Sequence, residues 1–81
     1  MWEVIGYEKS FVQREGQNGY EAFNLHVKKP VSPGPNAEGC RCRTFWYRAH
    51  EISYVPNVGD TVIIETELRG KYEIIRDIQR V

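Results

Sequence analysis

The apolar residues of this chain are mostly branched or aromatic, and this property most constrains its fold. Val and Ile number 8 and 7, Leu and Ala number only 2 and 3, and Phe, Trp and Tyr add 10 more. Branched and aromatic side chains suit the pleated surface of a strand, whereas Leu and Ala favour helices. The composition therefore predicts an all-β protein.

Length and charge limit the remaining choices. With 81 residues the chain is expected to form one domain over residues 1–81, near the size at which a single core is just sufficient. The 11 basic and 11 acidic side chains give a formal net charge of zero, which excludes a polycation that binds nucleic acid through its net positive charge alone. No apolar run approaches the roughly 20 residues of a membrane span.

The expected compartment is the cytoplasm. The chain begins Met1-Trp2-Glu3, without a charged and then apolar leader, and it contains only two cysteines. A small secreted domain would carry a denser cysteine framework. An intracellular protein with reduced thiols is therefore expected.

Five segments are predicted to be strands. The second is the clearest, because Phe23, Leu25 and Val27 recur at period 2 and mark one buried face. Gly6 interrupts the alternation of the first and predicts a bulge there. The expected strands are Trp2 to Gln13, Tyr20 to Lys28, Cys40 to Ala49, Asp60 to Leu68 and Lys71 to Ile78.

The segment 29–39 is predicted to be a flexible loop, because it holds three prolines and two glycines. Closing five strands into a barrel would remove exposed sheet edges and bury one face of each strand. A small five-stranded barrel is therefore expected, with an SH3-like barrel as the alternative.

The segment from Val58 to Ile64 resembles the Val-Gly-Asp-x-Val strand entry of many OB-fold and SH3-like barrels. The order of a long first hairpin, a Pro/Gly loop, an aromatic third strand and a final hairpin is similar to the small OB-fold single-stranded-DNA-binding proteins of phages and bacterial mobile elements. This resemblance implies an OB-like barrel that binds single-stranded nucleic acid on the faces of its second and third strands.

The third strand carries the best candidate binding face. Arg41, Arg43, Phe45 and Tyr47 alternate along it and would project to one side. Cations contact phosphates and aromatic rings stack on bases without needing a particular sequence. The neighbouring second strand would add further residues to this face. The predicted site is Tyr20, Lys28, Lys29, Arg41, Arg43, Phe45 and Tyr47, with His26 peripheral.

The opposite arrangement of the third strand remains open. Phe45 and Tyr47 would then face the core with Trp46 outside, and the two arginines would pair with acids on neighbouring strands. Charge is unevenly distributed in either case. Residues 28–48 hold five basic side chains and one acid, whereas residues 51–67 hold four acids and no Lys or Arg.

No residue pattern indicates an enzyme, a cofactor or a metal. Cys40 and Cys42 share a strand face, but Cys-x-Cys without a second pair is not a usual zinc knuckle, and buried free thiols are expected instead. The serines lie in no nucleophile-elbow context, and no glycine-rich phosphate loop precedes a helix.

The expected function is single-stranded nucleic-acid binding without strong sequence specificity, with DNA favoured over RNA by the resemblance alone. A homodimer is left open as a further partner. The alternative is a protein-interaction module of a phage or mobile element that has no nucleic-acid contact, which the neutral net charge favours.

Overall fold

The computed structural model describes all 81 residues and contains five strands and no helix. There is accordingly no helix that could cross a membrane. The all-β prediction and the five expected strands are confirmed, with ends shifted by one or two residues. The strands are β1 (Trp2–Val12), β2 (Tyr20–Pro30), β3 (Cys40–Arg48), β4 (Thr61–Arg69) and β5 (Tyr72–Arg80).

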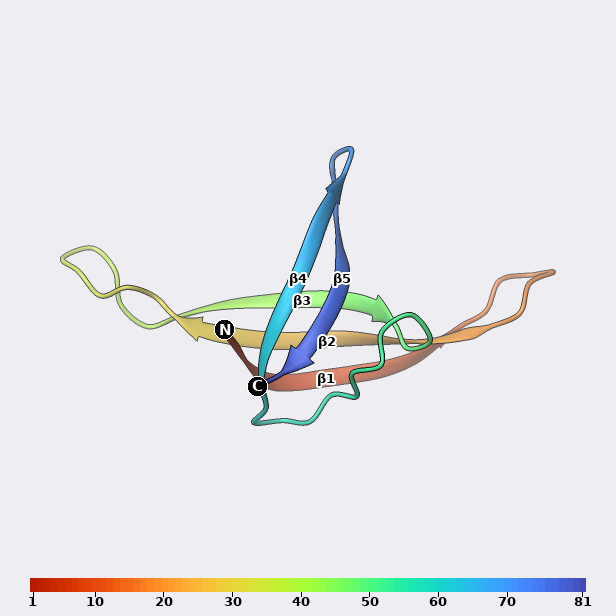
Figure 1. The fold of residues 1–81 in the computed structure, drawn as a ribbon, viewed down its shortest axis with the longest axis horizontal. Coiled ribbons are helices and arrows are strands. Elements are labelled where there is room, and N and C mark those ends of the chain that lie inside the picture. Colours follow the sequence, from red (N-terminus) through yellow and green to blue (C-terminus); the bar gives the residue numbers. More distant parts are fainter.

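The strands form one antiparallel sheet in the order β3-β2-β1-β4-β5. Strands β1, β2 and β3 make a long ladder, and the β4–β5 hairpin rises across it (Figure 1). The hairpin joins the ladder through only two residue pairs, Trp2 with Val62 and Glu3 with Thr61. The register of β1 shifts between Val4 and Gly6, which confirms the bulge predicted at this glycine.

The sheet does not close into a barrel, so that prediction is wrong. Strands β3 and β5 are its two edges and form no ladder with each other. The hairpin pairs with the ladder only at its base, and across the opening Arg43 of β3 forms an ion pair with Glu73 of β5 at 3.1 Å. Two strand edges therefore remain unpaired.

The core lies between the ladder and the hairpin. Phe23, Leu25 and Val27 are buried, as their spacing predicts. Nine residues form the buried cluster: Val4, Phe23, Leu25, Val27, Phe45, Tyr47, Ile52, Val62 and Ile78.

Two tyrosines attach the connection between β3 and β4 to this core. Tyr47 Oη donates to the Tyr54 carbonyl at 2.9 Å, and Tyr54 Oη donates to Asp60 Oδ2 at 2.8 Å. Burial raises the pKa of Tyr47, and burial together with the Asp60 hydrogen bond raises the pKa of Tyr54 to about 12. Both phenols therefore remain neutral donors that fix the connection in place.

Phe45 and Tyr47 face the core, so their predicted exposure is wrong. They are only 7% and 3% exposed. The cause is the β2–β3 register, which places Leu25 opposite Phe45 and Phe23 opposite Tyr47. Side chains directly opposite each other project from the same face of a sheet. Trp46 consequently points outward and is 46% exposed.

Two smaller expectations also need correction. Cys40 and Cys42 are exposed free thiols, not buried ones, because they lie on the uncovered outer face of an edge strand. Lys29 and Pro30 belong to β2, so the loop covers 31–39. Main-chain bonds cross this loop, from Val31 N to the Gly39 carbonyl at 2.9 Å and in both directions between Gly34 and Ala37.

Candidate functional site

A group of basic side chains gathers where β2 and β3 meet the loop 31–39. Lys29 and Arg41 lie directly opposite each other across the two strands, and Lys28, opposite Cys42, projects from the other face of the sheet. None of these three cations has a carboxylate within 4.0 Å. Like charges placed directly opposite each other destabilise a sheet. This place therefore favours an anion from outside the chain.

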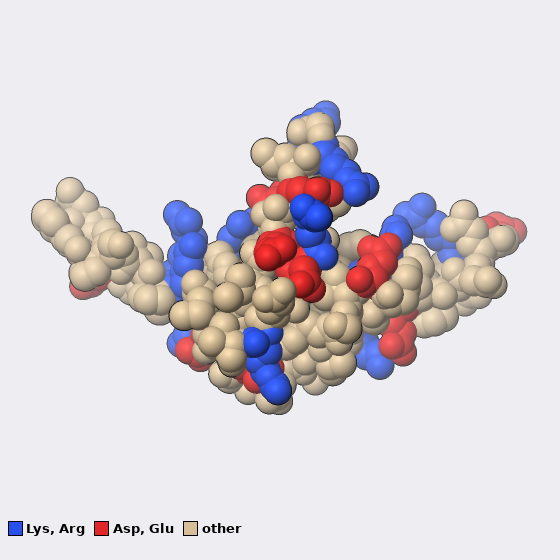
Figure 2. Space-filling model, in the orientation of Figure 1, with Lys and Arg blue, Asp and Glu red and all other residues tan.

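The surroundings of Lys29 and Arg41 leave room for such an anion. The two side chains line a hollow of about 310 Å³ together with Pro30, Val31 and Ser32. Lys29 Nζ lies 4.4 Å from the centroid of the Trp2 ring, and this cation–π contact holds the ammonium group near the surface. Figure 2 shows Lys and Arg side chains standing beside the base of this loop, on the left of the molecule.

Two further arginines of β3 form ion pairs with carboxylates at the surface. Arg43 pairs with Glu73 and Arg48 pairs with Glu51, each at 3.1 Å, and all four side chains are partly exposed. Exposed ion pairs of this kind contribute about 0–1 kcal/mol. A phosphate could therefore replace either carboxylate at little cost.

Arg48 is also the centre of an aromatic cluster on the outer face. Its Cζ lies 4.9 Å from the Tyr20 ring centroid and 5.7 Å from that of Trp46. Tyr20 stands edge-on to Trp46 at 6.3 Å and to His50 at 6.0 Å. The Arg48 Nε group is buried and has no hydrogen-bond partner. An unsatisfied buried donor costs about 1–3 kcal/mol, so the Arg48 side chain is held in this cluster at a cost in stability.

The edge of β3 connects the basic group to the aromatic cluster. Ala49 N donates to the Glu21 carbonyl, and Val31 N to the Gly39 carbonyl, which fixes the alternation of hydrogen bonds along β2 and β3. The main-chain groups of Cys42, Thr44 and Trp46 therefore point away from β2. A groove of about 500 Å³ separates this edge from β5, and its lining includes Arg43, Trp46, Arg48, Arg69, Glu73 and Ile75.

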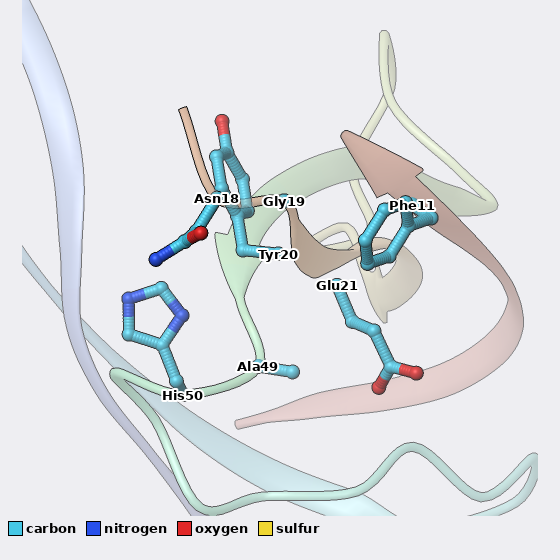
Figure 3. Close-up of a pocket in the computed structure, with 7 residues that line it drawn as sticks. All are labelled: Phe11, Asn18, Gly19, Tyr20, Glu21, Ala49 and His50. Carbon is cyan, nitrogen blue, oxygen red and sulfur yellow. The ribbon is translucent and has the colours of Figure 1, made fainter. Parts of the chain in front are cut away.

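The largest hollow adjoins the aromatic cluster at the turn end of the β1–β2 hairpin. It measures about 690 Å³ and is lined by Phe11, Asn18, Gly19, Tyr20, Glu21, Ala49 and His50. Figure 3 shows Asn18, Tyr20 and His50 gathered on one side of it and Phe11 and Glu21 on the other. The Phe11 ring lies against Gly19, so a side chain at residue 19 would displace this ring. The hollow extends the exposed aromatic surface beyond Tyr20.

His26 lies apart from both groups. Its Nδ1 is 2.7 Å from Thr44 Oγ1, and its Nε2 is 2.8 Å from Glu8 Oε2, so it bridges β1 and β3 across the outer face. The carboxylate of Glu8 makes the middle of that face unfavourable for phosphate. The edge of β3 is the better path for an anionic ligand.

The structure brings together only part of the predicted site. Lys28, Lys29 and Arg41 form the basic group, Arg43 stands at the groove, Tyr20 belongs to the aromatic cluster, and Phe45 and Tyr47 are removed by burial. Sequence reasoning missed Trp46 and Arg48 as site residues. A reliable β2–β3 register would have found them, because it fixes which residues of β3 face outward.

No three of the His, Cys, Asp and Glu side chains are grouped in a way that could hold a metal ion.

The chain matches no protein-family model, and no curated protein and no solved structure is significantly similar to it. The function must therefore be argued from the site itself.

Proposed function

We propose that this protein binds single-stranded nucleic acid along the free edge of β3, without strong sequence specificity. The observation that carries the proposal is the pair Lys29 and Arg41, two cations directly opposite each other with no carboxylate beside them. Phosphate is the ligand chemistry that would relieve this repulsion, and each phosphate neutralised releases counterions.

The path along β3 has the length of a short oligonucleotide site. Arg41 and Arg48 lie seven positions apart, or about 23 Å at the rise of an extended strand. Arg41 and Arg43 project from one face of this edge, and Trp46 and Arg48 project from the other. Because β3 is an edge strand, a ligand beside it can reach both sets. Single-strand sites of this type cover about 4–16 nucleotides.

Trp46 is the proposed stacking ring, and Tyr20 extends the stacking surface. A base that stacks on an exposed ring gains about 1–3 kcal/mol whatever its identity. The rings of Phe45 and Tyr47 have no part in this proposal, because the core covers them. Phe45 instead supports Arg43, whose Cζ lies 4.4 Å from the ring centroid.

The architecture supports an OB-like assignment as part of the same proposal. An OB fold is a partly open barrel of five antiparallel strands that binds oligonucleotides on the face of its second and third strands and through the loops that follow its first and fourth strands. Here the sheet has five antiparallel strands with an opening between β3 and β5. Arg69 ends β4 and Lys71 lies in the turn that follows it, and the loop after β1 carries Arg14.

The alternative function, a protein-interaction module, is favoured by a different observation. The β4–β5 hairpin exposes Leu68 and Tyr72 near its tip, away from the basic group. Apolar side chains exposed in this way can mark a contact with another protein. The two functions require different surfaces and can be tested separately.

Titration with a single-stranded oligonucleotide distinguishes the two functions. On adding oligo-dT at low salt, we expect quenching of tryptophan fluorescence, because a base that stacks on Trp46 removes it from water. We also expect the logarithm of affinity to fall linearly with the logarithm of salt concentration, as phosphate neutralisation requires. A Trp46→Phe variant should lose most of the quenching, and a duplex of the same length is the matched ligand control.

A flat fluorescence response of the folded protein at low salt, together with no change in oligonucleotide anisotropy, would contradict the proposal. Binding that did not depend on salt would also contradict it.

A further inference from the structure

The β4–β5 hairpin extends away from the rest of the molecule as an arm (Figure 1). Its base is held by the two pairs with β1, and farther out it contacts the body through Ile75, which packs against the core cluster, and through the ion pair between Arg43 and Glu73. Near the tip, Tyr72 on the outward face is 68% exposed and Leu68 on the opposite face is 74% exposed. A two-stranded hairpin is only marginally stable alone in water. The arm would therefore be stabilised by a surface that covers it.

The outward face of the arm carries two carboxylates that no cation balances. Glu65 and Asp77 lie directly opposite each other across β4 and β5, and neither has a Lys, Arg or His nitrogen within 4.0 Å. Asp77 accepts only a hydrogen bond from Gln79 Nε2, at 3.1 Å. Like charges directly opposite each other are destabilising in a sheet. This position therefore favours cations from outside the chain.

The same face carries cations at its other end. Lys71, in the turn at the tip, has no carboxylate within 4.0 Å, and Arg69 contacts Glu67 at 3.0 Å. Arg76 also turns to Glu67, at 3.7 Å, and not to Glu65. Figure 2 shows basic side chains at the tip of the arm and acidic side chains below them. The arm is therefore basic at its tip and acidic toward its base.

Ile74 lies midway between these two ends. Its partner across the hairpin is Glu67, whereas Arg69 pairs with Tyr72 nearer the tip and Glu65 pairs with Asp77 nearer the base. A two-fold axis through Ile74 would superpose the tip of one arm on the acidic pair of another arm that runs in the opposite direction. The two ends of the face are thus complementary to each other in charge. At the centre lie Ile74, half-buried at the rim of the groove beside β3, and Glu67, which Arg69 and Arg76 neutralise.

We propose that this face of the β4–β5 hairpin is the contact surface for a second copy of this chain. In the pair, Ile74 packs against Ile74 of the other copy, and Arg69 and Lys71 of each copy meet Glu65 and Asp77 of the other. Such an interface is isologous, because each patch meets an identical patch. A surface of two short strands lies below the roughly 1,200 Å² of standard interfaces, so the association is weak and depends on concentration. The proposal does not rest on nucleic-acid binding.

Reversing the charges at one end of the contact face or at the other tests this arrangement. One variant carries Glu65→Lys with Asp77→Lys, and the other carries Arg69→Glu with Lys71→Glu. The two ends of the face then carry the same sign of charge, so neither variant should self-associate in sedimentation equilibrium. An equimolar mixture should associate, because both ends of the mixed pair again bring opposite charges together. The wild type should rise from 9.5 kDa toward twice that mass as concentration increases.

Adding Ile74→Asp to both variants is the control for general attraction between oppositely charged proteins. It should abolish association of the mixture, whereas attraction through net charge alone would survive it. Circular dichroism checks that each variant is folded. The proposal is overturned if the wild type stays monomeric at all concentrations, if either variant alone associates as the wild type does, or if the Ile74→Asp mixture still associates.

Discussion

Replacing Phe45 with Ala is expected to lower the free energy of unfolding by about 3–5 kcal/mol, the usual loss for a buried aromatic ring. Phe45 lies within the core cluster and stands edge-on to Trp2, with ring centroids 6.0 Å apart. Domains of this kind are stabilised by only about 5–15 kcal/mol in total. Urea unfolding followed by far-ultraviolet circular dichroism measures the change.

Trp46→Ala is the matched control for this loss. Trp46 is adjacent in sequence but faces outward, so its truncation should cost much less stability than that of Phe45. If Phe45→Ala kept wild-type stability and instead weakened oligonucleotide binding, the ring would have to face solvent. The assigned orientation of β3 would then be wrong.

Trp46→Ala is also expected to weaken binding of oligo-dT about tenfold or more while leaving the protein folded. This follows from the roughly 1–3 kcal/mol that one stacked base contributes on an aromatic ring. The loss should be similar for oligonucleotides of different sequence, because every base offers a face for stacking. Fluorescence anisotropy of a labelled oligonucleotide gives the affinities.

Tyr7→Ala provides the control for this prediction. Tyr7 is 45% exposed, almost the same as Trp46, but it lies on β1 opposite Leu25 and so on the other face of the sheet. Its removal should leave affinity unchanged. Equal losses in the two variants would show that the ligand does not contact the outer side of β3.

The sequence predicted the strands of this fold more accurately than whether their sheet closes into a barrel. The alternation of Phe23, Leu25 and Val27 is sufficient to identify the buried face of β2, and Gly6 marks the bulge in β1. Closure depends on how many residues of β1 pair with β4. No local pattern in the sequence specifies that only Trp2 and Glu3 do so.

The face of β3 could not be read from β3 alone. Aromatic residues occupy consecutive positions from Phe45 to Tyr47, so either alternation gives a plausible buried face. Pairing with β2 decides which face of β3 is buried. The buried face of β2 is clear from its pattern, and the register places Leu25 of that face opposite Phe45. The basic residues remain accessible whichever face they occupy, because Lys28 and Lys29 lie near the end of β2 and Arg41 lies near the start of the edge strand β3. Lys28, Lys29 and Arg41 therefore stay in the proposed site, whereas two of the three rings do not.

The salt dependence of oligonucleotide binding by a Lys29→Gln, Arg41→Gln variant tests the central claim most directly. Each phosphate contact to single-stranded nucleic acid contributes about 0.7 to the slope of log affinity against log salt, so losing two contacts should reduce the slope by about 1.4. Lys9→Gln with Arg80→Gln removes the same charge elsewhere and should leave the slope nearly unchanged. An unaltered slope in the first variant, or equal reductions in both, would contradict the assignment of Lys29 and Arg41 as the phosphate site.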